Sequence, residues 1–166
     1  LDPETGEYNF PYIRTYLNGV EVKVIHLVFR EQGLFVQRGN PKKVKGLESL
    51  LRKDISFINR QKGSGTRILL DHTLKNLSLD SNQIRGYEKE EFTHMAVAST
   101  VASGVADAGL GILSAARAMD LDFMPIAKER YDVIIPSIYF EDEKVQKVIE
   151  TIRSDEFKRM VSQMGG

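Results

Sequence analysis

The chain has 166 residues, of which 42% are hydrophobic and 28% charged, so it can bury the core of one domain or of two small lobes. Its 23 Lys and Arg residues balance its 23 Asp and Glu residues, and this zero formal charge argues against a general nucleic-acid-binding protein. The chain has no cysteine, which excludes disulfides and thiolate chemistry, and no apolar run reaches the roughly 18 residues of a membrane span. We see no signal peptide and expect a cytoplasmic protein with no membrane partner.

The first part of the chain predicts one short helix and an interrupted strand. Residues 11–17 fit the helix. Residues 20–29 are typical of a strand, which the polar stretch 30–33 is expected to break before a second extended piece at 34–36. The nearly continuous apolar run 24–29 favours a strand buried on both faces.

The middle of the chain alternates between helical and extended patterns. A short helix is expected at 46–51 and a buried strand at 55–58. A helix then runs from a glycine-rich turn to about Leu77, and the polar residues 78–91 are expected to form a connection without a strand. The small apolar residues of 95–103 predict another helix, which the following glycine would end.

The last part of the chain continues this alternation, which argues for an α/β fold with mainly parallel strand pairing. Ligands of such folds sit at the carboxyl ends of the strands. The expected elements are a strand at 106–112, a helix at 113–119, strands at 122–126 and 131–135, and helices around 145–152 and 157–164.

The glycine-rich turn at residues 63–66 is the strongest candidate for a binding site. Ser64, Gly65 and Thr66 stand between the strand at 55–58 and the next helix, where Ser64 or Thr66 can cap the helix. The first turn of a helix presents N–H groups without an internal partner and the positive end of the dipole. Together with two hydroxyls, these groups suit a compact anion. A plain capped turn explains the same residues, and a nucleotide P-loop lacks its Lys here.

Charged residues beside this turn add to the case for an anion. Arg60 and Gln61 precede the turn and Arg67 follows it. Either Arg60 or Gln61 can reach a ligand, with an ion pair at a surface or hinge as an equal alternative. Arg67 can point at the anion or at the other lobe. The acidic run 88–91 is expected to be a solvated face.

A second helix start offers further candidates. Tyr87 lies in the preceding loop, Thr93 can cap the helix, and His94 can donate to an oxyanion. A structural role is the alternative for His94. The Asp107 carboxylate would repel an anion, so we expect it to bond a neighbouring backbone N–H.

Catalysis has little support in this sequence. There is no nucleophile elbow of the G-x-S-x-G type and no cysteine nucleophile. The three His residues lack the H-x-x-x-H spacing of zinc ligands. We therefore expect no catalytic residue, no metal ligand and no cofactor, and a binding domain rather than an enzyme.

Eight short motifs recur together in a known family. The chain resembles the periplasmic-binding-protein-like domain, also called LysR-substrate-binding-like, of molybdate-related proteins. That domain is found fused to molybdopterin biosynthesis enzymes and following helix-turn-helix regions in molybdate-responsive regulators. The motifs are ETGEYN at 4–9, REQGL at 30–34, GNP at 39–41, NRQKGSGTR at 59–67, GYEKEEFTH at 86–94, VASGVADAGLGI at 101–112, LDF at 121–123 and ERYD at 129–132.

The resemblance implies a type II binding-protein fold, with two α/β lobes joined by two crossing strands. Lobe one would comprise 1–38 and 129–166, and lobe two 39–128. Gly109 would help to close the cleft between the lobes and permit close backbone approach. Members of the family carry a further stretch before the first motif, so lobe one is expected to be incomplete at its N-terminus. A homodimer or another chain would then complete its sheet.

The resemblance also implies a solute-binding or sensor domain. Its ligand would be a small tetrahedral oxyanion, molybdate or tungstate, held in the cleft between the lobes by neutral donors. Closure on the anion would report to a fused molybdopterin biosynthesis enzyme or helix-turn-helix region. Two alternatives stay open, namely a regulatory domain for an organic effector, pterin-like or a carboxylate, and an accessory to a molybdopterin biosynthesis enzyme.

Overall fold

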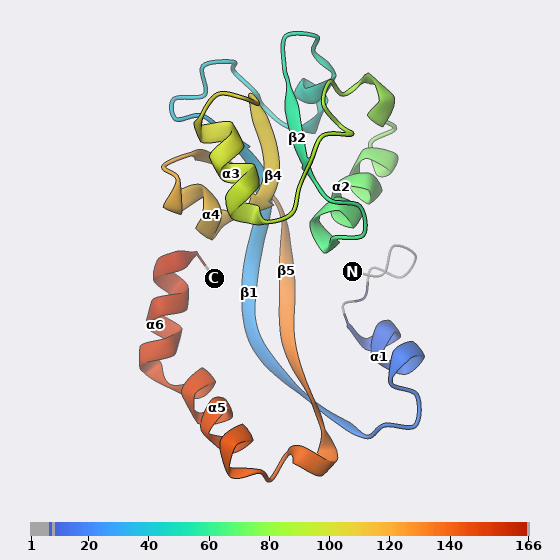
Figure 1. The fold of residues 1–166 in the computed structure, drawn as a ribbon, viewed down its shortest axis with the longest axis vertical. Helices are drawn as coiled ribbons and strands as arrows, with labels where there is room; N and C mark the ends of the chain where they lie inside the picture. The colour runs from blue at the N-terminus through green and yellow to red at the C-terminus, as the bar shows by residue number, and fades with distance from the viewer. Residues whose placement is uncertain (1–6, 8, 166) are drawn as a thin grey trace. The chain divides into compact units, whose positions relative to one another are not determined.

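The computed structural model describes residues 7 and 9–165. They divide into two compact units, a smaller one whose described residues are 7, 9–30 and 129–165 and a larger one of residues 31–128. The lobe boundaries that the resemblance implies stay a prediction. Figure 1 shows the elements, which are α1 (Phe10–Tyr16), β1 (Val22–Val36), the 3₁₀ helix η1 (Leu47–Leu51), β2 (Phe57–Arg60), α2 (Gly65–Asn76), the 3₁₀ helix η2 (Ser81–Gln83), β3 (Glu90–Glu91), α3 (His94–Ala102), β4 (Ala108–Ile112), α4 (Leu113–Ala118), β5 (Asp122–Pro136), the 3₁₀ helix η3 (Ser137–Tyr139), α5 (Glu143–Arg153) and α6 (Asp155–Met164).

One mixed sheet orders the strands as β3-β2-β4-β1-β5. β2 runs parallel to both β3 and β4, which confirms the parallel pairing expected of an α/β fold. β1 departs from that expectation, because it runs antiparallel to β4 with Leu34 opposite Leu110. The three parallel strands therefore end at one edge of the sheet, and each leads into a helix there.

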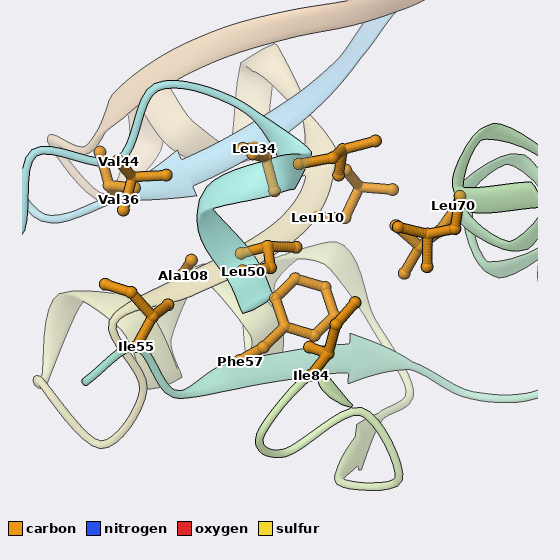
Figure 2. Close-up of a cluster of buried hydrophobic side chains, with 12 residues drawn as sticks. Leu34, Val36, Val44, Leu50, Ile55, Phe57, Leu70, Ile84, Ala108 and Leu110 are labelled. Carbon is orange, nitrogen blue, oxygen red and sulfur yellow. The ribbon is translucent and has the colours of Figure 1, made fainter. Parts of the chain in front are cut away.

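One face of the sheet in the larger unit carries a core of large aliphatic side chains. Successive residues of a strand point to opposite faces, so Leu34 of β1, Phe57 of β2 and Leu110 of β4 meet on this face. Leu50 of η1 and Leu70 of α2 cover them, and all five are at most 1% exposed. Figure 2 shows this cluster. Burying such side chains contributes about 1.5–3 kcal/mol each before the entropy of ordering them.

The opposite face of the sheet is covered by α3 and α4 through smaller side chains. Phe35 and Ile58 meet Val97 and Ala98 of α3 there. A Cβ on Gly109 of β4 would lie 2.5 Å from Cγ1 of Val97, so only a glycine lets α3 approach this closely. In Figure 1 α2 lies to one side of β2 and β4, and α3 and α4 to the other.

The expected break at residues 30–33 is wrong, because β1 is one strand of 15 residues. Arg30 stays in the strand because Glu129 of β5 accepts from its Nε at 2.6 Å and its guanidinium lies over the ring of Tyr131. Gly33 is extended and lies close to the neighbouring backbone, since a Cβ there would be 2.1 Å from the carbonyl oxygen of Met124. Arg30 and Gly33 therefore hold β1 against β5 instead of ending the strand.

Two further corrections concern strands. The pieces expected at 122–126 and 131–135 form a single strand, β5, whose Pro125 is tolerated because β5 is an edge strand. The connection expected over 78–91 contains β3, whose two residues pair with Asn59 and Arg60. The two residues of β3 are too few to give a pattern, and the polar residues 128–130 divide the apolar pattern of β5 into two.

The prediction that residues 24–29 are buried on both faces is also wrong. This half of β1 is partly exposed throughout, and Phe29 is 44% exposed. Residues 32–36 are the buried part, because only there does β1 lie between two other strands with helices on both faces. An apolar run alone does not reveal which of its residues a sheet will cover.

The smaller unit has little core of its own. Among its described residues, the buried apolar side chains are Ile135 of β5 and Ile149 of α5. α5 packs against α6. Ser154 is the single residue between the two helices along the chain, and its hydroxyl caps α6 by accepting from the N–H of Phe157. No helix in the described part of the chain is long and apolar enough to cross a membrane.

Asp132 of β5 organises the polar contacts of the smaller unit. Its buried carboxylate accepts from Nε of Arg130 at 2.8 Å and from Nδ2 of Asn9 at 2.9 Å, and it lies 3.2 Å from Nδ1 of His26. Burial alone would raise the pKa of this carboxyl, but the hydrogen bonds outweigh burial and lower the pKa below its ordinary value of 3.8.

A carboxyl with a lowered pKa stabilises the fold above its unfolded pKa, and that contribution is lost as the pH falls through the folded pKa. We therefore expect the smaller unit to lose stability as the pH drops below 3.8, the ordinary value for Asp. Asp132→Asn should lower the free energy of unfolding at pH 7 by about 1.5 kcal/mol and flatten this acid response, because hydrogen bonds to charged groups contribute about that much. Urea unfolding at several pH values measures both effects.

Asp155→Asn is the matched control, because the Asp155 side chain is 96% exposed at the start of α6. It should change the unfolding free energy by less than about 0.5 kcal/mol. Equal acid responses for both variants would contradict the role given to Asp132.

Candidate binding site

The glycine-rich turn begins α2 in the way the sequence predicts. Ser64 has an extended backbone and its Oγ accepts from the N–H of Arg67 at 3.2 Å, so Ser64 is the N-cap. Gly63 has a φ of +83°, which favours glycine there. Gly65 is exposed, whereas Thr66 is 4% exposed. Gly63 is exposed as well and Ser64 is half-buried, so Thr66 is the one residue of this turn that is withdrawn from solvent.

Arg67 faces away from solvent and is fully engaged by protein groups. Its side chain is 4% exposed, with Nε 3.0 Å from Asp71 and Nη1 3.2 Å from Glu90. The guanidinium carbon lies 4.1 Å from the centre of the Tyr87 ring, and the Tyr87 hydroxyl donates to Asp71. Burial and the hydrogen bond to Asp71 raise the pKa of Tyr87. Arg67 and Tyr87 therefore brace α2 against the loop before β3.

Glu90 corrects the expectation that 88–91 is only a solvated face. Its carboxylate accepts from the N–H of Lys62 at 3.2 Å as well as from Arg67, so it joins β3 to the glycine-rich turn. Nothing in the local sequence signals this role, because its partners lie far away along the chain.

Arg60 connects the two loops that precede α2 and α3. It is the last residue of β2 and is 8% exposed. Its Nε donates to Oε1 of Gln61 at 3.0 Å and its Nη2 donates to the carbonyl of Phe92 at 3.2 Å. A buried positive charge thus lies where β2 and β3 end.

The start of α3 matches the expected cap. Oγ1 of Thr93 accepts from the N–H of Ala96 at 3.0 Å. His94 is half-buried and its ring lies against β4, since a Cβ on Gly111 would be 3.1 Å from its Nδ1. α2 and α3 therefore begin at the same edge of the sheet, where the parallel strands β2 and β3 end.

Two candidates lie away from this edge. Gly109 is buried under α3, where its lack of a side chain serves helix packing. Asp107 lies at the opposite end of β4 and accepts from the N–H and the hydroxyl of Ser56 at 2.8 and 2.7 Å. The backbone-bonding role expected of Asp107 is confirmed. In the described part of the chain, no group of three His, Asp or Glu side chains could hold a metal ion.

The architecture and the comparison with known families agree. The family model described as PBP superfamily domain matches residues 1–153. The chain belongs to this superfamily. This membership is consistent with a binding site where β2 and β3 end, because α/β folds bind their ligands at the carboxyl ends of the parallel strands.

Two relatives of this PBP superfamily chain are uncharacterized. YvgK of Bacillus subtilis (strain 168) is 41% identical over 165 residues, which cover 99% of this chain and 53% of YvgK. A protein in the ferredoxin 2Fe-2S gene 5′ region of Clostridium pasteurianum is 37% identical over 100 residues, which cover 60% of this chain and 88% of that protein. The chain thus spans about half the length of YvgK.

Solved structures similar to this PBP superfamily chain have type II periplasmic-binding-protein-like folds. PEB3 bound to L-phospholactate has a TM-score of 0.61 and 21% identity, covering 86% of this chain and 67% of PEB3. The Synechocystis PCC6803 CcmR regulatory domain with 2-PG has a TM-score of 0.63 and 18% identity, covering 81% and 67%. The substrate binding domain assigned to a molybdenum ABC transporter of Clostridium difficile has a TM-score of 0.63 and 17% identity, covering 93% and 71%. At these identities the likeness shows the fold.

Proposed function

We propose that this PBP superfamily domain is a sensor that binds a small oxyanion, molybdate or tungstate, at the edge where α2 and α3 begin. The observation that carries the proposal is the pair of helix N-termini at the ends of the parallel strands β2 and β3, with the Arg60 guanidinium buried between their loops. Each terminus directs backbone N–H groups and a positive dipole end toward this edge.

The donors at this edge are mostly neutral. Ser64 and Thr93 cap the two helices, and the first turns of α2 and α3 add backbone N–H groups from Gly65 and His94 onward. Arg67 acts indirectly in this proposal, because its charge is already matched by Asp71 and Glu90. A site of this kind would separate molybdate from sulfate by size, because the two anions carry the same charge.

The known proteins give further support of a coarser kind. One structural relative is assigned to molybdenum transport, and others are titled as complexes with L-phospholactate and with 2-PG. Folds of this superfamily typically bind ligands without turning them over, so we propose a binding rather than a catalytic role. A fused molybdopterin biosynthesis enzyme or helix-turn-helix region would read the bound state.

An organic effector is the second candidate. A surface hollow of about 400 Å³ beside Tyr87 favours it, because this volume exceeds that of a tetrahedral oxyanion. The hollow is lined by Asp71, Leu74, Lys75, Leu79, Asp80, Ser81 and Tyr87. Its acidic side chains suit a pterin-like molecule better than a carboxylate.

Thermal unfolding with sodium molybdate, tungstate, sulfate or phosphate tests the proposal. An anion at about 100 times its dissociation constant should stabilise the larger unit by about 2.7 kcal/mol, which shifts the midpoint of that unit's transition by several degrees. We expect this shift for molybdate and tungstate and a much smaller one for sulfate and phosphate. Equal shifts for all four anions, or none, would contradict the proposal.

Variants of the two N-cap residues test where the anion binds. Ser64→Ala and Thr93→Ala each remove a hydroxyl from the proposed edge and should weaken molybdate binding at least about tenfold, the equivalent of about 1.4 kcal/mol. Ser99→Ala, on the exposed side of α3, is the control and should leave the affinity unchanged. Isothermal titration calorimetry gives the dissociation constants directly.

A further inference from the structure

The turn that joins α1 to β1 carries an asparagine followed directly by a glycine (Figure 1). Asn18 and Gly19 lie between Leu17, the C-cap of α1, and Val22, where β1 begins. The N–H of Val20 donates to the carbonyl of Leu17 at 3.0 Å and closes the turn. Asn18 and Gly19 are both exposed, so the pair lies in an open surface turn of the smaller unit.

Asn18 differs from the other asparagines of the chain in its side-chain contacts. The chain has six asparagines, and all of them lie among the described residues. In five of them the side-chain amide forms a hydrogen bond, with Asp132 for Asn9, Val44 for Asn40, Tyr87 for Asn59, His72 for Asn76 and Asp80 for Asn82. Within the described part of the chain, no hydrogen bond holds the side chain of Asn18. Its carboxamide therefore has the freedom to turn toward its own backbone.

The backbone nitrogen of Gly19 is equally accessible. Among the backbone hydrogen bonds of the described residues, none uses the N–H of Gly19. Gly19 has a φ of +79°, and a Cβ there would meet nothing within 4 Å, so its surroundings are open. Without a Cβ, a glycine lets its nitrogen approach the preceding carboxamide closely. The other five asparagines precede residues with side chains, which are Phe10, Pro41, Arg60, Leu77 and Gln83.

We propose that Asn18 is a site of spontaneous deamidation. The Gly19 nitrogen loses its proton and attacks Cγ of Asn18, so that a new C–N bond forms while the amide nitrogen leaves Cγ as ammonia. The resulting five-membered succinimide takes up one water, which opens either of its two carbonyl–nitrogen bonds. The products are aspartate and isoaspartate at position 18. Water is the only co-reactant, no atom is oxidised or reduced, and the reaction is independent of the ligand of the larger unit.

Both products change the turn. Each replaces a neutral amide with a carboxylate, which adds one negative charge to a chain whose formal charge is zero. In isoaspartate the backbone runs through the side-chain carbons of position 18, so it is one carbon longer between Leu17 and Gly19. The hydrogen bond between Val20 and Leu17 no longer fits this length. Deamidation therefore loosens the connection between α1 and β1.

Ageing of the full 166-residue chain in mildly alkaline buffer tests the proposal, because base removes the proton from the Gly19 nitrogen. Trypsin cuts after Arg14 and Lys23, and the peptide 15–23 that contains Asn18 is followed by mass spectrometry. It should gain about 1 Da and separate into two products, one of which an isoaspartate methyltransferase labels. An unaged sample digested in parallel corrects for deamidation during digestion. A peptide 15–23 that keeps its mass would overturn the proposal.

The peptide 76–85 of the same digest is the internal control. It contains Asn76 and the exposed Asn82, whose amides are hydrogen-bonded and which precede residues with side chains. It should gain mass at least about tenfold more slowly than peptide 15–23. A smaller ratio would show that the turn at Asn18 has no special reactivity.

A synthetic peptide of residues 15–23 measures what the fold contributes. Because the turn is open, the folded chain should deamidate less than about tenfold more slowly than this peptide, and stronger protection would overturn the site in the native chain. Asn18→Gln should stop the mass gain of peptide 15–23, since a glutamine would have to form a larger ring. Asn82→Gln is the matched control and should leave the reaction at Asn18 unchanged. Continued mass gain in peptide 15–23 of the Asn18→Gln chain would contradict the assignment.

Discussion

Gly86→Ala is expected to destabilise the larger unit by about 3 kcal/mol or more. Gly86 has a φ of +94°, and an L-residue in the left-handed region costs roughly 1–2 kcal/mol. A Cβ there would also lie 2.2 Å from the carbonyl oxygen of Phe57. Phe57 cannot move away freely, because its N–H donates to the carbonyl of Arg85 at 2.8 Å and its ring is in the core. Urea unfolding followed by far-UV circular dichroism measures the loss.

Gly39→Ala separates the two causes. Gly39 has a φ of +78°, but a Cβ there would meet nothing within 4 Å. It should therefore cost only the backbone strain, roughly 1–2 kcal/mol. Equal losses in the free energy of unfolding for both variants would show that the clash of a Cβ at position 86 with β2 adds nothing to the backbone strain.

Arg67→Met should be the second large effect, a loss of about 3 kcal/mol. The change leaves Glu90 and Asp71 without their buried cation, and breaking a buried ion pair costs about 3–5 kcal/mol. We place the loss at the lower end because both carboxylates are partly exposed, at 26% and 46%. The contact over the Tyr87 ring is lost as well. Urea unfolding gives the free energy.

Arg52→Met is the matched control for a surface pair. Arg52 lies 2.7 Å from Asp54, but the two side chains are 42% and 52% exposed. Exposed pairs contribute less than about 1 kcal/mol, so this variant should be close to the parent chain. Similar losses for both arginines would show that burial of the Arg67 network does not matter.

Local signals predicted the parts of the site that are themselves local. Ser64 and Thr93 are the N-caps, because a hydroxyl before an apolar helical pattern bonds an N–H only three residues away. The positive φ of Gly104 after α3 follows from the same kind of signal. The family motifs then led to the superfamily that the comparison shows.

Contacts between residues far apart along the chain could not be predicted from the sequence. Arg67 was expected near an anion, but Glu90, which lies 23 positions along the chain, takes part of its charge. The break expected at 30–33 failed for the same reason, because Glu129 stabilises Arg30 from another strand. A single sequence indicates which groups are polar, and strand register decides which of them meet.

The uneven burial of β1 has a consequence for how the chain unfolds. Residues 32–36 of this strand lie in the core of the larger unit, whereas residues 22–30 belong to the smaller unit, in which β1 and β5 form a two-stranded ribbon with few buried side chains. One continuous strand therefore spans two cooperative units of different stability. Heat should melt the ribbon while the remainder of the same strand keeps its hydrogen bonds, so a two-state description fails and a single midpoint does not characterise the whole chain.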